Sequence, residues 1–166
     1  MLREEYYMKE ALMMAHKAYE LNDVDYMKLA LEEAKKAFSL DEVPIGALII
    51  KDGKIISKYY NRKSLDNVAT YHAEVLVIEE ACKILGTWYL DDCILYTTVE
   101  PCMMCTGAII QARIPKVVYG ATNDAFGYLS KIDTKIEVIG GILEEECSNI
   151  LSDFFKKRRQ ENLTNS

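Results

Sequence analysis

The sequence predicts a three-layer α/β/α domain around a central mixed sheet of about five strands, on three observations. Short apolar segments alternate with longer helix-forming segments along most of the 166 residues, as is typical of a sheet covered by helices. An Asp-Gly pair separates the first two apolar segments and indicates an antiparallel hairpin. Helices and strands then alternate, and right-handed crossovers would make the strands after residue 90 largely parallel to a neighbour.

The composition is that of a single globular domain. Half of the residues are hydrophobic and 28% are charged, which suits one core. No apolar run approaches the roughly 18 residues of a membrane span, and the first residues lack the apolar segment of a secretion signal. Five cysteines without framework spacing favour a reducing compartment. We expect a soluble cytoplasmic protein with no membrane partner; its net charge of −6 disfavours nucleic acid but leaves room for a local basic patch.

The N-terminal part contains a tandem repeat of a helix-forming segment. A shift of 19 positions aligns residues 6–24 with residues 25–43, and both copies are rich in helix formers. The second copy leads into the first strand, so we expect it to pack on the core and to end near Leu40. The first copy, within residues 1–24, is predicted to be an extra helix, packed outside the domain or on a neighbouring subunit. The matches are Tyr7-Met8-Lys9 with Tyr26-Met27-Lys28, Ala11-Leu12 with Ala30-Leu31, Ala15 with Ala34, and Lys17-Ala18 with Lys36-Ala37.

The main domain, residues 25–160, alternates predicted strands and helices. Apolar runs with many β-branched residues predict strands at residues 45–50, 55–60, 94–99, 116–119 and 136–139. The predicted helices cover residues 75–85, 102–112 and 143–159. Gly86 is expected to end the first of these helices and Pro101 to begin the second. Polar segments at 61–70 and 121–135 are predicted loops, and a tail at 161–166 is expected to fray.

Two short motifs lie where helices are predicted to begin: His72-Ala73-Glu74 and Pro101-Cys102-Met103-Met104-Cys105. The helix after the first motif rises roughly 20 Å, and the next strand returns roughly 23 Å. The two helix starts can therefore meet at one edge of the sheet. Cys102 and Cys105 are three positions apart and face the same side of a first helical turn. A helix N-terminus also favours the thiolates that a metal requires.

One imidazole and two thiolates form a ligand set of catalytic zinc sites. We predict that His72, Cys102 and Cys105 bind one zinc ion and leave its fourth position to water. Zinc lowers the pKa of such a water to about 7, and Glu74 is placed to take its proton and pass it to a leaving nitrogen. The combined pattern is the known signature of zinc-dependent nucleobase deaminases. Three other cysteines lie among apolar residues and are predicted core thiols: Cys82, Cys93 and Cys147.

Beyond these motifs, residues 25–159 resemble the cytidine and deoxycytidylate deaminase superfamily, and within it the bacterial tRNA-specific adenosine deaminases. The resemblance implies a cytidine-deaminase-like fold, one zinc ion per subunit and a homodimer. It also implies conversion of adenosine to inosine at the wobble position of a tRNA anticodon stem-loop. The resemblance rests on Glu42-Val43-Pro44-Ile45-Gly46-Ala47, Asn61-Arg62, the two zinc motifs, Gly107-Ala108-Ile109-Ile110, Arg113-Ile114-Pro115-Lys116-Val117-Val118-Tyr119-Gly120-Ala121 and Ser152-Asp153-Phe154-Phe155.

The resemblance also implies how substrate is held. Asn61 matches a family position that contacts the bound nucleotide, and Ala73 matches one whose backbone faces the base. The basic end of the last helix, residues 156–159, matches a region that meets the anticodon stem. The chain departs from the family pattern in a shorter segment between residues 120 and 136, in Tyr71 before the histidine, in Lys63, and in the repeated helix.

These departures keep two other functions open. One is a deaminase of a free base, nucleoside or nucleotide of the guanine or cytosine type, which the acidic balance and the shortened segment favour. The other is a non-catalytic, zinc-stabilised interaction domain that uses the extra helix for docking. The last reading predicts that Glu74→Ala leaves function intact, whereas both enzymatic readings predict its loss.

Overall fold

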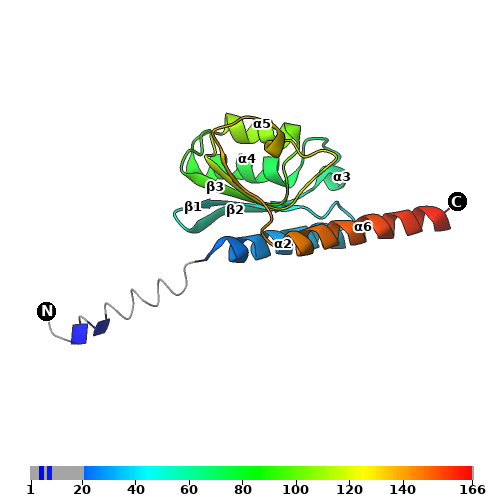
Figure 1. Ribbon diagram of the computed structural model, residues 1–166, viewed down its shortest axis with the longest axis horizontal. Helices are drawn as coiled ribbons and strands as arrows, with labels where there is room; N and C mark the ends of the chain where they lie inside the picture. The colour runs from blue at the N-terminus through cyan, green and yellow to red at the C-terminus, as the bar shows by residue number, and fades with distance from the viewer. Residues whose placement is uncertain (1–3, 6, 9–20, 166) are drawn as a thin grey trace.

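The computed structural model describes residues 4–5, 7–8 and 21–165, and it is built around one five-stranded sheet. The predicted fold class is therefore confirmed: a mixed sheet lies between two layers of helices (Figure 1). The predicted extra helix at 1–24 lies mostly outside the described residues. Within the described part of the chain, no helix is long and apolar enough to cross a membrane.

The sheet combines an antiparallel hairpin with a parallel half. Its spatial order is β2-β1-β3-β4-β5. β1 pairs antiparallel with β2 and β3, whereas β3, β4 and β5 are parallel, as right-handed crossovers predict. Positive φ angles at Asp52 (50°) and Gly53 (71°) form the expected Asp-Gly hairpin turn. The strands are β1 (Gly46–Lys51), β2 (Lys54–Tyr60), β3 (Cys93–Val99), β4 (Lys116–Ala121) and β5 (Glu137–Ile139).

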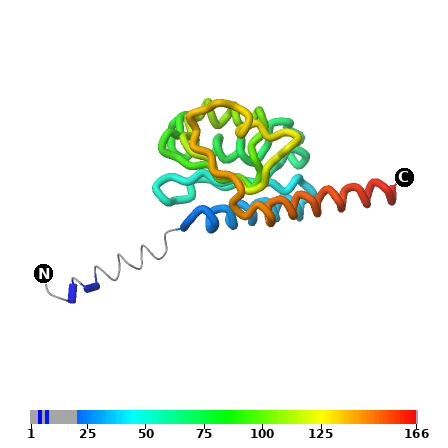
Figure 2. The backbone as a smooth tube through the Cα atoms, in the orientation of Figure 1, coloured from blue at the N-terminus to red at the C-terminus, as the bar shows by residue number. Residues whose placement is uncertain are grey.

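Two pairs of helices cover the two faces of the sheet (Figures 1 and 2). α2 (Asp23–Ser39) and α6 (Glu144–Thr164) lie side by side on one face, and α4 (Ala73–Leu85) and α5 (Met103–Gln111) lie on the other. Successive strand residues point to opposite faces. Ile49 and its neighbours in register therefore join the core under α4, whereas Leu48 joins the core under α2.

The structure corrects two predicted helix starts. A capping box between Asn22 and Asp25 begins α2 at Asp23, slightly before the predicted copy at 25–43. α5 begins at Met103, so Pro101 is not its first residue as predicted. The reason is that Cys102 pairs with Gly127 in an isolated β-bridge. The backbone of Cys102 is therefore extended, and the helix begins only at the next residue. Gly86, with φ of 67°, ends α4 as predicted.

Two predicted loops and the predicted tail contain helical turns. Residues 61–70 include the short helix α3 (Lys63–Asp66), and residues 121–135 include the 3₁₀ turn η1 (Leu129–Lys131). α6 continues to Thr164, through residues expected to fray. No glycine or proline interrupts this stretch, and Lys157 pairs with Glu161 one turn later at 3.8 Å.

Candidate metal and active site

The site lies where α4 and α5 begin. His72 and Cys102 are the N-cap residues of these two helices, and both have extended backbones. The return path through β3 brings the two helix starts together, as the lengths of helix and strand predict. His72 Nδ1 lies 3.7 Å from Cys102 Sγ and 3.5 Å from Cys105 Sγ. The ligand atoms of these three residues all lie within 4.8 Å of one another.

This donor set fits a tetrahedral metal with one open position. An imidazole nitrogen and two sulfurs suit zinc, and three protein ligands leave a fourth site for water. An observation beside the cluster supports the same interpretation. Glu74 Oε2 is buried and has no hydrogen-bond partner among the described residues. Because an orphaned buried oxygen is costly, its position next to a metal-ligand cluster indicates a group that is partnered only when the site is loaded.

The two thiols of the cluster have pKa values shifted in opposite directions. A hydrogen bond from Cys105, helped by one from His72, lowers the pKa of Cys102 to about 4. The same contact with Cys102, together with burial, raises the pKa of Cys105. The contact with Cys102 also raises the pKa of His72. The cluster therefore favours the thiolate at Cys102, and binding of a metal would displace the remaining protons.

Glu74 follows His72 by two positions and turns toward the interior of the site. Glu74 is only 3% exposed, and burial raises the pKa of its carboxyl group. One oxygen, Oε1, accepts a hydrogen bond of 3.3 Å from the Thr97 hydroxyl. The other is the unpartnered Oε2. A carboxyl group with a raised pKa holds a proton more readily than a solvated glutamate does, which suits a proton carrier.

A second buried carboxylate, Glu42, positions Asn61, and its role was missed in the sequence. Asn61 Nδ2 donates to Glu42 Oε1 at 2.9 Å. Glu42 Oε2 accepts from the backbone N–H groups of Ser64 (2.8 Å) and Leu65 (3.0 Å), at the start of α3. Glu42 therefore holds both the asparagine and the short helix that follows it. The available signal was an acidic residue next to a buried strand, which must be paired if it is buried.

Ala73, the second residue predicted to meet substrate, opens α4 between His72 and Glu74. It is fully buried in the core cluster that includes Val77. Its small side chain lets the first turn of α4 pack closely under the site. Contact between its backbone and a base stays a prediction.

Glu100 anchors the segment after β4 beside the cluster, and this role was also missed. Its carboxylate accepts from the backbone N–H groups of Ser130 (2.9 Å) and Asn123 (3.3 Å). A Cβ at Gly127 would collide with this carboxylate, so only glycine fits there. The segment therefore lies against Cys102, and its Phe126 side chain is 76% exposed. The signal was a single acid before Pro101, which sequence alone does not connect to residues so far along the chain.

Tyr71, which stands where the resembled family has a small residue, points elsewhere. It lines a hollow of about 220 Å³ together with Tyr59, Arg62 and residues of α4 such as Glu79. The cluster residues His72, Cys102 and Cys105 do not line this hollow. The larger side chain is thus accommodated without entering the cluster.

Comparisons with known proteins agree with this geometry. Residues 21–159 match the model of the MafB19-like deaminase family. A tRNA-specific adenosine deaminase of Bacillus subtilis (strain 168) is 44% identical over an alignment of 169 positions, which covers 96% of this chain and 93% of the relative. A structure from studies of A-to-I editing by tRNA:A34 deaminases at the wobble position superposes with a TM-score of 0.71, at 40% identity, over 76% of this chain and 98% of that one. A guanine deaminase structure from Bacillus subtilis gives a TM-score of 0.59, at 45% identity, over 61% of this chain and 66% of that one.

Proposed function

This chain belongs to the MafB19-like deaminase family and groups with the tRNA-specific adenosine deaminases, and on that premise we propose that it converts adenosine to inosine in tRNA. The reaction replaces the exocyclic amino group of the base with oxygen from water and releases ammonia. The observation that carries the proposal is the buried, unpartnered oxygen of Glu74 beside the cluster of His72, Cys102 and Cys105. That arrangement matches the chemistry of the zinc nucleobase deaminases.

We propose that His72, Cys102 and Cys105 hold one zinc ion per subunit. Zinc, when bound, supplies a Lewis acid that makes a water molecule nucleophilic near neutral pH. The protein prepares the ligands for it. The hydrogen bond from Cys105 keeps Cys102 deprotonated, and His72 presents Nδ1 to both sulfurs.

Glu74 is the proposed proton carrier. It accepts the proton of the attacking water and delivers it to the nitrogen that leaves. Burial serves this role because it raises the pKa of the carboxyl group, so the protonated form is accessible in mid-reaction. The Thr97 hydroxyl fixes Oε1 at 3.3 Å, which leaves Oε2 as the oxygen that moves the proton.

Substrate is proposed to be held by four features of the domain. Asn61, fixed by Glu42, contacts the nucleotide, and the backbone of Ala73 faces the base. The exposed ring of Phe126 offers a stacking surface for a flanking base. The far end of α6 extends beyond the sheet (Figure 1). There Lys157 and Arg158 pair with Asp41, so the neighbouring basic residues remain for the phosphates of the anticodon stem.

A homodimer is proposed through the outer face of α5. Met103, Gly107 and Ile110 lie on one stripe of this helix and are exposed, Met103 by 67%. A Cβ at Gly107 would meet no other atom within 4 Å, so a second helix can approach this face closely. An exposed apolar stripe beside an active site indicates a protein interface. The enzyme and its tRNA are proposed to meet in the cytoplasm.

The proposal is tested with an anticodon stem-loop that carries adenosine at the wobble position. Zinc-loaded protein is expected to convert that adenosine to inosine, which mass spectrometry of the nucleosides detects. A stem-loop with adenosine placed two positions away serves as the matched control. Absence of inosine with micromolar protein and full zinc occupancy would refute the proposal.

Deamination of guanine is the second candidate function. It is supported by the guanine deaminase structure, which is 45% identical over 61% of this chain. Ammonia release from free guanine, cytosine and their nucleosides distinguishes the two candidates. Turnover of a free base without conversion of the stem-loop would replace the first proposal with the second.

A further inference from the structure

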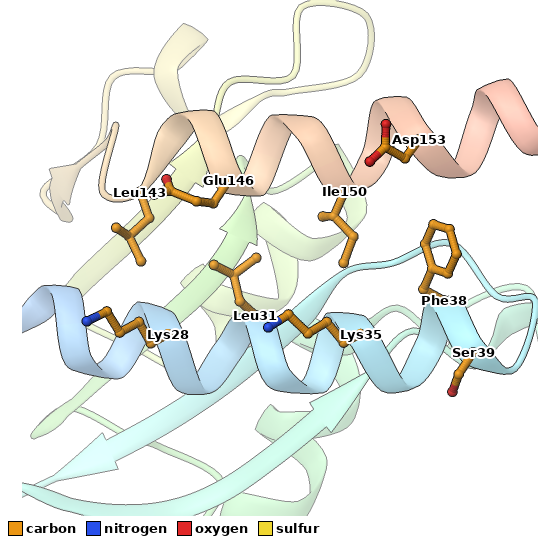
Figure 3. A pocket seen from close by; sticks show the side chains of 9 residues that line it. All are labelled: Lys28, Leu31, Lys35, Phe38, Ser39, Leu143, Glu146, Ile150 and Asp153. Atoms are coloured by element: carbon orange, nitrogen blue, oxygen red, sulfur yellow. The ribbon is translucent and has the colours of Figure 1, made fainter.

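A groove of about 580 Å³ runs between α2 and α6 (Figure 3). Apolar side chains from both helices form its walls, and they face each other across it: Leu31, Phe38, Leu143 and Ile150. The rims carry opposite charges, with lysines on α2 and acids on α6: Lys28, Lys35, Glu146 and Asp153. The groove lies on the face opposite the metal site, so neither the ligands nor Glu74 belong to it.

The tandem repeat supplies a segment that requires such a surface. In α2, Met27, Ala30, Leu31 and Ala34 form the stripe that packs into the core, and each is at most 7% exposed. The first copy has the same four residue types at the same spacing, at Met8, Ala11, Leu12 and Ala15. A helix with this stripe is stable in water only when the stripe is covered. Met8, at 62% exposed, is uncovered in the structure.

The connection between the two copies allows the first to fold back over the groove. Leu21 and Asn22 are not helical, and the capping box at Asn22 closes the N-terminus of α2. If residues 4–20 form a helix, these two residues are its whole link to α2, and a link of that length is typical of two antiparallel helices. A helix over residues 4–20 would match α2 in length, at 17 residues or about 25 Å.

The lengths also set which residues would meet. Because the link is at 21–22, an antiparallel return places Leu12 next to Leu31 and Met8 next to Lys35. Ile150 of α6 lies across the groove from this stretch (Figure 3). Glu4 and Glu5 would reach the end of the groove that Lys35 and Phe38 line, which places opposite charges together.

We propose that residues 4–20 dock as a helix in the α2–α6 groove of the same chain, through Met8, Leu12 and Ala15. This interaction surface is separate from the proposed function. Docking adds a third helix to the layer formed by α2 and α6. It stabilises the position of α6, whose basic end extends from the domain.

A photo-crosslinking amino acid in place of Leu12, in the full-length protein, tests the proposal. Mass spectrometry is expected to find its crosslinks on α2 and α6 around Leu31 and Ile150. The same group at Met13, which in the proposed helix would face away from the stripe, is the control and is expected to crosslink there at background level. Crosslinks from position 12 that avoid the groove would overturn the proposal.

A second variant measures the groove itself. Ile150→Glu is expected to lower the yield of the groove crosslink about tenfold, since a buried charge replaces an apolar contact. Asn149→Glu adds the same charge at an exposed neighbouring position and is expected to leave the yield unchanged. An equal yield in both variants would contradict docking in the groove.

Mixing isotopically light and heavy protein decides which chain provides the segment. Crosslinks confined to light–light and heavy–heavy pairs support docking within one chain. Mixed light–heavy pairs at the groove would overturn it in favour of exchange between two copies. If Ile150→Glu does not fold, as circular dichroism would show, the map from position 12 decides alone.

Discussion

Two buried carboxylates, Glu42 and Glu74, lie in the same domain and have opposite surroundings. Both are nearly inaccessible, at 1% and 3% exposed. The oxygens of Glu42 accept three hydrogen bonds, from Asn61 and from the backbone at the start of α3. Glu74 accepts one from Thr97, and its second oxygen has no partner within the described residues.

The difference separates a carboxylate that supports the structure from one that is kept for chemistry. Complete hydrogen bonding compensates the burial of Glu42 and fixes its neighbours. Incomplete hydrogen bonding at Glu74 costs stability, and the fold keeps that cost where a reacting group is proposed to enter. Exchanging the carboxylate for an amide at each position should therefore affect different quantities.

Glu74→Gln is expected to have the largest effect on catalysis and a small effect on folding. Loss of the proton carrier should lower kcat for the stem-loop about a thousandfold. The uncharged amide removes a desolvated acid, so the thermal midpoint should stay equal or rise. Rates are measured by inosine formation, and zinc content is measured on the same samples. An unchanged rate would refute the role of Glu74 as the proton carrier.

Removal of metal tests whether the cluster around Glu74 is built for zinc. Dialysis against a chelator is expected to abolish conversion and to lower the thermal midpoint, because metal binding contributes to folding. Zn²⁺ should restore both, whereas Mg²⁺, which prefers oxygen ligands, should not. Full activity of protein shown by elemental analysis to be free of zinc would disprove the metal assignment.

Glu42→Gln should have the opposite effects to Glu74→Gln: it should lower folding stability and change kcat little. The amide NH₂ must face either Asn61 Nδ2 or the N–H groups of α3, all of which are donors. One unsatisfied pair costs about 1–3 kcal/mol of folding stability. Because Asn61 is proposed to bind the nucleotide, KM should rise about tenfold, the factor that corresponds to 1.4 kcal/mol, with little change in kcat.

Glu32→Gln, on the exposed face of α2, is the control for the same chemical change. Among the described residues its side chain pairs with the exposed Lys35 alone, so stability and KM should stay close to those of the unmodified protein. A loss of stability in Glu42→Gln without any change in KM would show that the network supports α3 but does not position Asn61 for substrate.

The same contrast explains what the sequence could predict. Cys102 and Cys105 are three positions apart at a helix start, so spacing within one turn already indicated their common direction. Glu74 follows His72 by two positions, a spacing that predicted a different direction from that of the histidine. Glu42 and Glu100 act on segments about 20 to 30 positions away, and only the folded sheet brings those partners together. The wrong start of α5 has the same origin, because the pairing of Cys102 with Gly127 is not local. The end of α6 was missed because exposed helix ends depend on several weak local terms.

The cysteines show the same contrast between buried groups of the core and groups of the site, and the effect expected from them is the smallest. Burial raises the pKa of both Cys93 and Cys147 to about 12, whereas that of Cys102 falls to about 4. An unfolded thiol ionises near pH 8.5, so each raised value makes the unfolded state bind fewer protons than the folded state above that pH. The stability that these two buried thiols contribute should therefore be fully present below about pH 8.5 and should be lost as the pH rises toward 12.

Alkylation of zinc-loaded protein with iodoacetamide at pH 8 checks the assignment residue by residue. Cys93 and Cys147 should stay unmodified until denaturant unfolds the chain, because the thiolate is the reactive form and both residues are fully buried. Cys82 is partly exposed and is the internal control, expected to react first. Modification of Cys147 at the rate of Cys82 would mean that α6 separates from the sheet in solution, and would also remove the wall on which the α2–α6 groove depends.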